Sequence, residues 1–178
     1  MAPHIVIPFT CTMTGNQAFC VAAPQCNGVL YELPAYLIQR LQSVQNAAVW
    51  LIFRIRRSEH IRPALISLHW LCIPVRISFK LAVLTYRSIH GTAPRYLQSC
   101  FTCVTDMTSR QRLRSSSSHH LAVPRIRLST VGKRAFPVSG ATVWNDLPPH
   151  VTSAPSLATF RQRLKSFLFS QSYSDIHT

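Results

Sequence analysis

The basic residues between positions 110 and 134 form the pattern with the clearest chemistry in this sequence. No acidic residue lies among them, and in an extended chain the first three would share one face. An arginine side chain presents a planar fork that matches phosphate, and each neutralised phosphate releases a counterion. The pattern predicts sequence-independent binding to an RNA or DNA backbone, and the alternative interpretation is a solvated loop without a ligand. The predicted contact residues are Arg110, Arg112, Arg114, Arg125, Arg127, Lys133 and Arg134.

The charge of the whole chain has the same sign as this segment. Lysine and arginine total 19 against 5 acidic residues, a formal net charge of +14. All of the basic residues except Lys80, Lys133 and Lys165 are arginine. Such a field attracts polyanions. An arginine surplus also arises from GC-rich coding sequence without selection, which is the alternative origin.

Acidic residues are too sparse for metal-dependent strand synthesis, which needs two or three carboxylates converging on magnesium. The five acids are at least 27 residues apart in sequence, and there are only five glycines and no glycine-rich phosphate loop. We therefore expect no enzyme activity, no catalytic residue, no cofactor and no small-molecule substrate. The acids are Glu32, Glu59, Asp106, Asp146 and Asp175.

Two cysteines have the spacing of a zinc knuckle, Cys100 and Cys103, with His119 and His120 downstream. Paired histidine ligands normally have three to five residues between them, and these two are adjacent. We expect no metal site here. A small zinc-binding module that uses Cys100 and Cys103 remains an alternative.

The first half of the chain is predicted to form several helices. From Pro34 onward apolar residues recur at spacings of 4, 3, 4, 3 and 4, which is one stripe of an α-helix. Further helices are predicted after Pro63, from Pro74 to His90 with a left-handed cap at Gly91, and after Pro94. The stripe residues are Leu37, Leu41, Val44, Ala48, Leu51 and Ile55.

The second half of the chain is predicted to be less regular. Residues 121–128 and 131–138 suggest a short β-hairpin, with Pro124 confining its first strand to an edge, and residues 140–147 suggest a helical turn. Ser153 is the predicted N-cap of a terminal amphipathic helix whose apolar face docks on the bundle.

The predicted fold class is therefore mainly α: a small helical bundle, a basic linker, a possible short hairpin and a C-terminal helix. The expected organisation is a poorly ordered segment over residues 1–25, a helical bundle over 26–100, a Ser/Thr-rich basic linker over 101–118 and a C-terminal module over 119–178.

Seven short motifs, given at the end of this paragraph in chain order, carry a resemblance to a known family. Together they resemble the C-terminal, post-polymerase end of the reverse transcriptase polyprotein of jockey-like non-LTR retrotransposons, from about residue 26 to residue 173. In the intact polyprotein the resemblance implies a role in gripping template RNA or target DNA near the polymerase. For this chain we expect a non-catalytic remnant with at most weak, sequence-independent nucleic-acid binding. A translated relic without a selected function, folded only in part, is the alternative. The motifs are LHWL (68–71), FKLAVLTY (79–86), HGTAPRYL (90–97), LRSS (113–116), RAF (134–136), VWNDLP (143–148) and SAPSL (153–157).

No segment has the length of a membrane span. The longest uninterrupted apolar run covers residues 47–53, whereas a spanning helix needs about 20 residues. No lysine or arginine precedes Arg40, so a secretory signal is not expected. We expect an intracellular protein, in the nucleus or cytoplasm, with reduced cysteines and no membrane partner.

Overall fold

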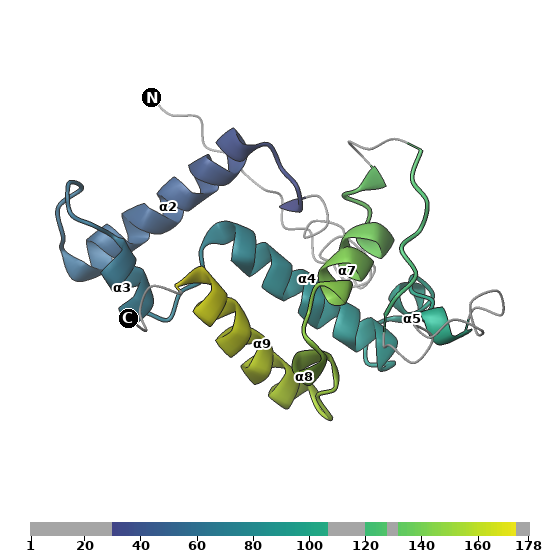
Figure 1. The fold of residues 1–178 in the computed structure, drawn as a ribbon. Helices are drawn as coiled ribbons and strands as arrows, with labels where there is room; N and C mark the ends of the chain where they lie inside the picture. Colours follow the sequence, from purple (N-terminus) through teal and green to yellow (C-terminus); the bar gives the residue numbers. More distant parts are fainter. Residues whose placement is uncertain (1–29, 107–119, 128–131, 174–178) are drawn as a thin grey trace, which may run out of the picture.

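The computed structural model describes residues 30–106, 120–127 and 132–173, and these residues are mainly helical. The expected helical bundle is confirmed. Figure 1 shows α2 and α3 at one end of the molecule and α5 at the other, with α4, α7 and α9 between them. The helices are α2 (Ala35–Phe53), α3 (Arg62–Ser67), α4 (Ile73–Ile89), α5 (Arg95–Gln98), α7 (Phe136–Asn145), α8 (Pro149–Thr152) and α9 (Leu157–Ser172), and a 3₁₀ turn covers Val104–Asp106.

Helix α4 is the centre of the fold and packs against both α7 and α9. It begins after Cys72 in extended backbone, with proline in its first turn, and His90 and the left-handed Gly91 follow it as predicted. Leu81 and Ala82 are fully buried. The apolar face of this helix therefore organises the larger of two cores.

Stacked aromatic rings join α4, α7 and α9. Phe160 is fully buried, with its ring centroid 4.4 Å from that of Tyr86 and 5.8 Å from that of Trp144. The Tyr86 hydroxyl donates a hydrogen bond to the Ala154 carbonyl at 3.0 Å. Buried aromatic rings contribute large apolar area and favour such offset stacks. The docking of the terminal helix on the bundle is thus confirmed.

The predicted N-cap of this terminal helix is wrong by three residues. Helix α9 begins at Leu157, and the Ser156 hydroxyl accepts a hydrogen bond from the Thr159 amide at 3.2 Å. Ser153 instead ends α8. Ser156 has the extended backbone of an N-cap, and the Ser153 backbone does not, so only Ser156 can cap the helix.

The predicted β-hairpin is not found among the described residues. The second predicted strand runs into α7, which starts at Phe136 because Ala135 is extended and Pro137 suits a first turn. The first predicted strand makes one isolated antiparallel bridge, from Leu121 to Cys103. Cys103 belongs to the predicted linker, so the start of that linker is packed structure, whereas residues 107–118 lie outside the described residues, as does the segment 1–25.

Helix α2 uses an unexpected face for packing. Its buried residues are Gln45 and Val49, and the Gln45 amide donates to the Leu71 carbonyl at 3.0 Å. The Gln42 side-chain oxygen accepts from the Ile73 amide at 2.9 Å. The apolar stripe identified in the sequence is consequently turned outward. Val49 instead joins a second, smaller core with Ala64, Leu65 and Tyr173.

Candidate nucleic-acid interface

Backbone hydrogen bonds join residues 102–104 to residues 120–122, and we call these two stretches the base of the arginine-rich segment. The Val104 amide donates to the His120 carbonyl at 3.0 Å, and the Ala122 amide donates to the Thr102 carbonyl at 2.9 Å. These bonds hold residues 102–104 beside residues 120–122. Arg110, Arg112 and Arg114 belong to the part of the chain between them, outside the described residues.

Asn145, at the end of α7, fastens the base to the bundle. Its side-chain oxygen accepts from the Leu121 amide at 2.8 Å, and its side-chain nitrogen donates to the Leu121 carbonyl at 2.9 Å. The Leu121 side chain is only 2% exposed. One asparagine thus satisfies both backbone groups of a buried residue that begins the next basic segment.

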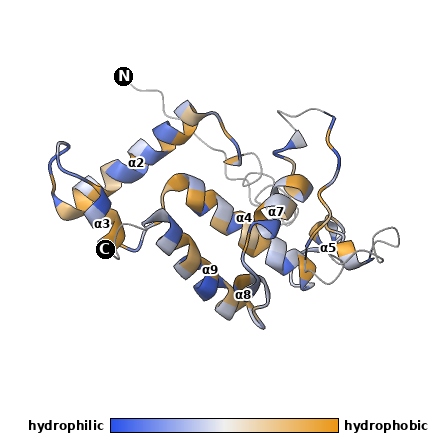
Figure 2. Cartoon of the chain, viewed as in Figure 1, coloured by the Kyte–Doolittle hydropathy of each residue, from blue (hydrophilic) through white to orange (hydrophobic). Residues whose placement is uncertain are grey.

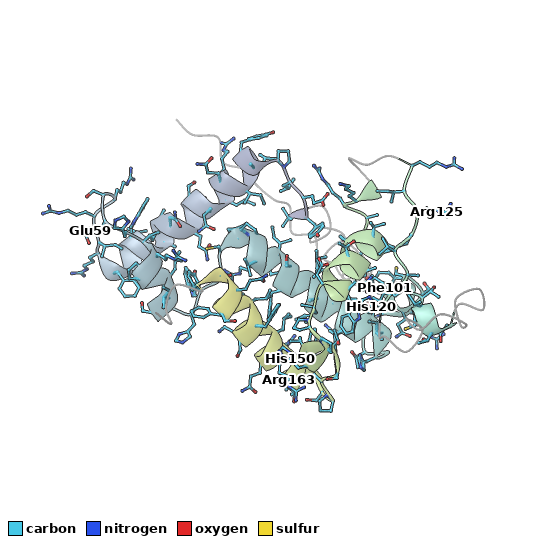
Figure 3. The ribbon with its side chains drawn as sticks, in the orientation of Figure 1. Glu59, Phe101, His120, Arg125, His150 and Arg163 are labelled. Carbon is cyan, nitrogen blue, oxygen red and sulfur yellow. The ribbon has the colours of Figure 1, made fainter. Side chains whose placement is uncertain are left out.

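Arg125 and Arg127 lie on the connection from this base toward α7, and both are exposed. Figure 3 shows Arg125 on the same side of the molecule as His120. Residues 122–127 are not a strand, which corrects the expected first hairpin strand on which Arg125 and Arg127 would share a face. A Cβ added at Gly132 would lie 2.8 Å from the Cβ of Ile126, so the chain turns back on itself. The structure therefore brings Arg125 and Arg127 toward Lys133.

Lys133 and Arg134 face an acid that sequence reasoning missed. The Lys133 ammonium lies 3.9 Å from a Glu32 carboxylate oxygen, with both side chains about half exposed at 52% and 47%. The Arg134 guanidinium donates to the Glu32 backbone carbonyl at 3.4 Å. Glu32 lies about a hundred positions earlier in sequence, so no local pattern could reveal the pairing. Lys133 and Arg134 therefore already have partners within the fold, which leaves them less available to bind phosphate.

A second group of exposed arginines gathers where α2 leads into α3. Arg54, Arg56 and Arg57 are exposed, and the Arg57 guanidinium lies 5.9 Å from the centroid of the Trp50 ring. The Glu59 carboxylate accepts a bond from the Arg56 amide at 3.4 Å. Figure 3 shows Glu59 at the opposite end of the molecule from His120 and Arg125. The basic surface is therefore divided between two ends of the bundle.

A cavity of about 700 Å³ lies beside the base of the basic segment. Cys100, Thr102, His120, Arg125 and Asn145 contribute to its wall. One cation and several hydrogen-bonding groups thus border a space large enough for a small anionic group.

The two cysteines of the zinc alternative line different cavities. Cys100 borders the cavity of about 700 Å³, whereas Cys103 borders a neighbouring one of about 300 Å³. Burial raises the pKa of the Cys100 thiol, and burial followed by the charge of Asp106 raises the pKa of Cys103. A zinc ligand must be a thiolate, so both shifts oppose binding.

Burial, and then the charges of Glu32 and Asp146, raise the pKa of Tyr31. Across residues 30–106, 120–127 and 132–173 no group of three or more His, Cys, Asp or Glu side chains could hold a metal ion. The same residues include no helix with the length and hydropathy of a membrane span.

Comparisons with protein families, with curated proteins and with solved structures give no match. The site is therefore argued from its own residues. Arg125 and Arg127 are exposed beside the anchored residues 120–122, and exposed arginines can neutralise phosphates.

Proposed function

We propose that this chain is a non-catalytic, sequence-independent nucleic-acid-binding remnant of the post-polymerase region of a jockey-like retrotransposon reverse transcriptase. The observation that carries the proposal is the charge imbalance of 19 basic to 5 acidic residues, supplied almost entirely by arginine. Arg125 and Arg127 are exposed beside the base from which the remaining arginines extend. Arginine forks bind phosphate oxygens in pairs of hydrogen bonds, and phosphate contacts carry no base sequence.

The fixed base supports this function physically. The Leu121–Asn145 hydrogen bonds fix residue 121 to the bundle, and the bridge to Cys103 holds residue 103 beside it. Two points of the chain that flank the predicted arginine contacts are therefore close together before any ligand binds, and the entropy of bringing them together is not charged to binding.

The seven predicted contact residues should not contribute equally to phosphate binding. Arg125 and Arg127 are exposed, whereas Lys133 and Arg134 contact Glu32. We therefore expect the first pair to contribute fully to phosphate binding and the second pair less. Removing the first pair should lower the slope of log K against log salt by about 1.8 for duplex and about 1.4 for single strands.

The experiment is fluorescence polarisation with an arbitrary 20-nucleotide RNA strand and with duplex DNA, over a salt series. The Arg125→Ala/Arg127→Ala chain should show the reduced slope. The matched control is Arg161→Ala/Lys165→Ala, which removes the same charge from exposed positions on α9. An equal loss in both variants would attribute binding to net charge alone and would contradict a localised interface.

The relic alternative concerns folding and needs a separate measurement. Thermal unfolding followed by circular dichroism should be cooperative if the core of α4, α7 and α9 forms as described. Gradual loss of helical signal without a transition would support a partly folded relic. A template-directed incorporation assay tests the absence of catalysis: incorporation that disappears on mutating one of the chain's own acids would refute it.

A further inference from the structure

Helix α2 carries a stripe of apolar side chains that faces outward. Val44 is 69% exposed, Leu51 is 80% exposed and Leu41 is 38% exposed. With Leu37 and Ala48 they recur at alternating spacings of 4 and 3 residues. Figure 2 shows hydrophobic residues along α2 at the edge of the fold.

The outward position of this stripe follows from how α2 is anchored. Gln45 and Val49 face inward, and hydrogen bonds from Gln42 and Gln45 reach the connection between α3 and α4. At 100° per residue, the inward face lies about a quarter turn from the centre of the stripe. This rotation of the helix leaves Leu41, Val44 and Leu51 of the stripe exposed, while Leu37 and Ala48 are half-buried.

The spacing of the stripe is that of a helix-pairing seam. Apolar residues alternating at 3 and 4 positions form the contact line of two helices packed side by side. On a helical projection the stripe covers about 80°, which is narrower than the face of about 100° or more with which a helix covers a core. The 19 residues of α2 extend over about 28 Å, enough for two heptads.

The charges beside the stripe define its partner. Arg40 lies next to the stripe, Arg54 follows the last turn, and both are exposed. The helix has no acidic residue between Ala35 and Phe53. Flanking residues of paired helices face each other, so acidic flanks on a partner would be attracted. A second copy of this chain, with a net charge of +14, would add repulsion.

We propose that the outward face of α2 docks an amphipathic helix with acidic flanks from a partner protein. Leu41, Val44 and Leu51 provide the apolar contact, and Arg40 and Arg54 provide the charge preference. The apolar part of the site is separate from Arg125 and Arg127, because Arg125 and His120 lie at the end of the molecule opposite Glu59 and the α2–α3 connection (Figure 3). Burial of the exposed side chains supplies the affinity, and the arginines select the sign of the partner.

The probe is a labelled three-heptad peptide with leucine and isoleucine at the seam and glutamate on both flanks. The first comparison peptide carries lysine instead of glutamate on its flanks. The second has the acidic composition in a scrambled order, and the third combines lysine with the scrambled order. Fluorescence anisotropy with the full chain should show binding of the ordered acidic peptide only. The scrambled acidic peptide is essential because any polyanion could bind the arginine-rich segment. Equal binding of the ordered and scrambled acidic peptides would overturn the proposal.

Two variants of the chain complete the test. Val44→Gln/Leu51→Gln should weaken binding at least about tenfold, because both seam side chains are buried by the partner. Tyr36→Gln is the control, since Tyr36 is 63% exposed on α2 but lies beside the stripe. Both variants should keep the helical signal and the nucleic-acid affinity, which separates this proposal from the proposed function.

Other occupants of the face give distinct results. Light scattering that shows self-association, lost in Val44→Gln/Leu51→Gln, would assign the face to a second copy. Co-sedimentation with phosphatidylserine vesicles, lost in the same variant, would assign it to a lipid surface. Either result, or failure of the ordered acidic peptide to bind, would overturn the proposal.

Discussion

Gly140 marks the closest approach of α7 to α4, and its replacement by alanine tests this packing. A Cβ at position 140 would lie 2.7 Å from the Thr85 hydroxyl oxygen and 2.8 Å from a carbon of the Phe101 ring. Thr85 is fully buried on α4 and its hydroxyl has no hydrogen-bond partner. Thr85 and Phe101 meet the new methyl group together, so α7 has to shift or both side chains have to move to admit it.

Two effects of opposite sign determine the magnitude. Alanine is favoured over glycine inside a helix by about 1 kcal/mol. Overpacking a filled core costs about 1–3 kcal/mol, and two contacts below 3.0 Å place this site in the upper part of that range. We therefore expect Gly140→Ala to lower the free energy of unfolding by about 1–2 kcal/mol. The steric effect exceeds the propensity effect.

The assay is urea unfolding followed by circular dichroism, with Thr85→Ala and the double variant completing a mutant cycle. Thr85→Ala removes the hydroxyl that the new methyl group meets, so the two changes should couple favourably by about 1 kcal/mol. If Gly140→Ala is as stable as the unmodified chain, or if the cycle shows no coupling, α7 does not lie against Thr85 as described.

Three further changes have defined outcomes. Ser156→Ala should lower the free energy of unfolding by about 1 kcal/mol through loss of the α9 N-cap, whereas Ser153→Ala should lower it by less than about 0.5 kcal/mol. If urea unfolding gave the reverse order, Ser153 would be the N-cap, as the sequence predicted. Asn145→Ala should cost about 2 kcal/mol by leaving both Leu121 backbone groups unpaired, and Asn145→Asp, which keeps the acceptor, about half as much; equal stability of all three chains would refute the clamp. Burial, and then the contact with a cysteine thiol, raise the pKa of Tyr173, so the folded state favours the protonated phenol. The contribution of Tyr173 to stability should be constant below the ordinary pKa of 10.0 and fall as pH rises above it. Tyr173→Phe should therefore reduce the alkaline decline in stability above pH 10, and an unchanged pH profile there would contradict the assignment.

The long helices could be predicted because their signals are local. Proline marks the start of α2 and α4, apolar residues recur at helical spacing, and Gly91 follows α4 in left-handed backbone. The start of α9 could be predicted less well from the sequence, because Ser153 and Ser156 are both followed by helix-forming residues. Only the backbone conformation distinguishes which serine reaches a free amide.

The hairpin failed because alternation over so few residues is a weak signal. Pro137 in fact indicated a helix start, and the partner of Leu121 proved to be Cys103 rather than the next segment. Pairing across 18 positions with the arginine-rich segment between them has no local sequence signature. A tertiary contact decided the structure there.

The candidate site depended on contacts between distant residues. Arginine spacing identified a basic surface, but the contacts of Lys133 and Arg134 with Glu32 join segments a hundred residues apart. The rotation of α2 was equally invisible, because it is set by hydrogen bonds from Gln42 and Gln45 and not by the apolar stripe. The hydrogen bond that Gln45 donates and the complete burial of Val49 lie on the same face, and together they set the rotation of the helix.

The most direct test of phosphate binding is the salt dependence of the unmodified chain. Arg110, Arg112, Arg114, Arg125 and Arg127 together predict a slope of log K against log salt near −4.5 for duplex DNA and near −3.5 for single strands, about five phosphates each. Affinity should then fall about 500-fold for duplex and about 130-fold for single strands between 50 and 200 mM salt, equally for unrelated base sequences. A slope near zero, no binding at 50 mM salt, or a strong preference for one base sequence would contradict the proposed function.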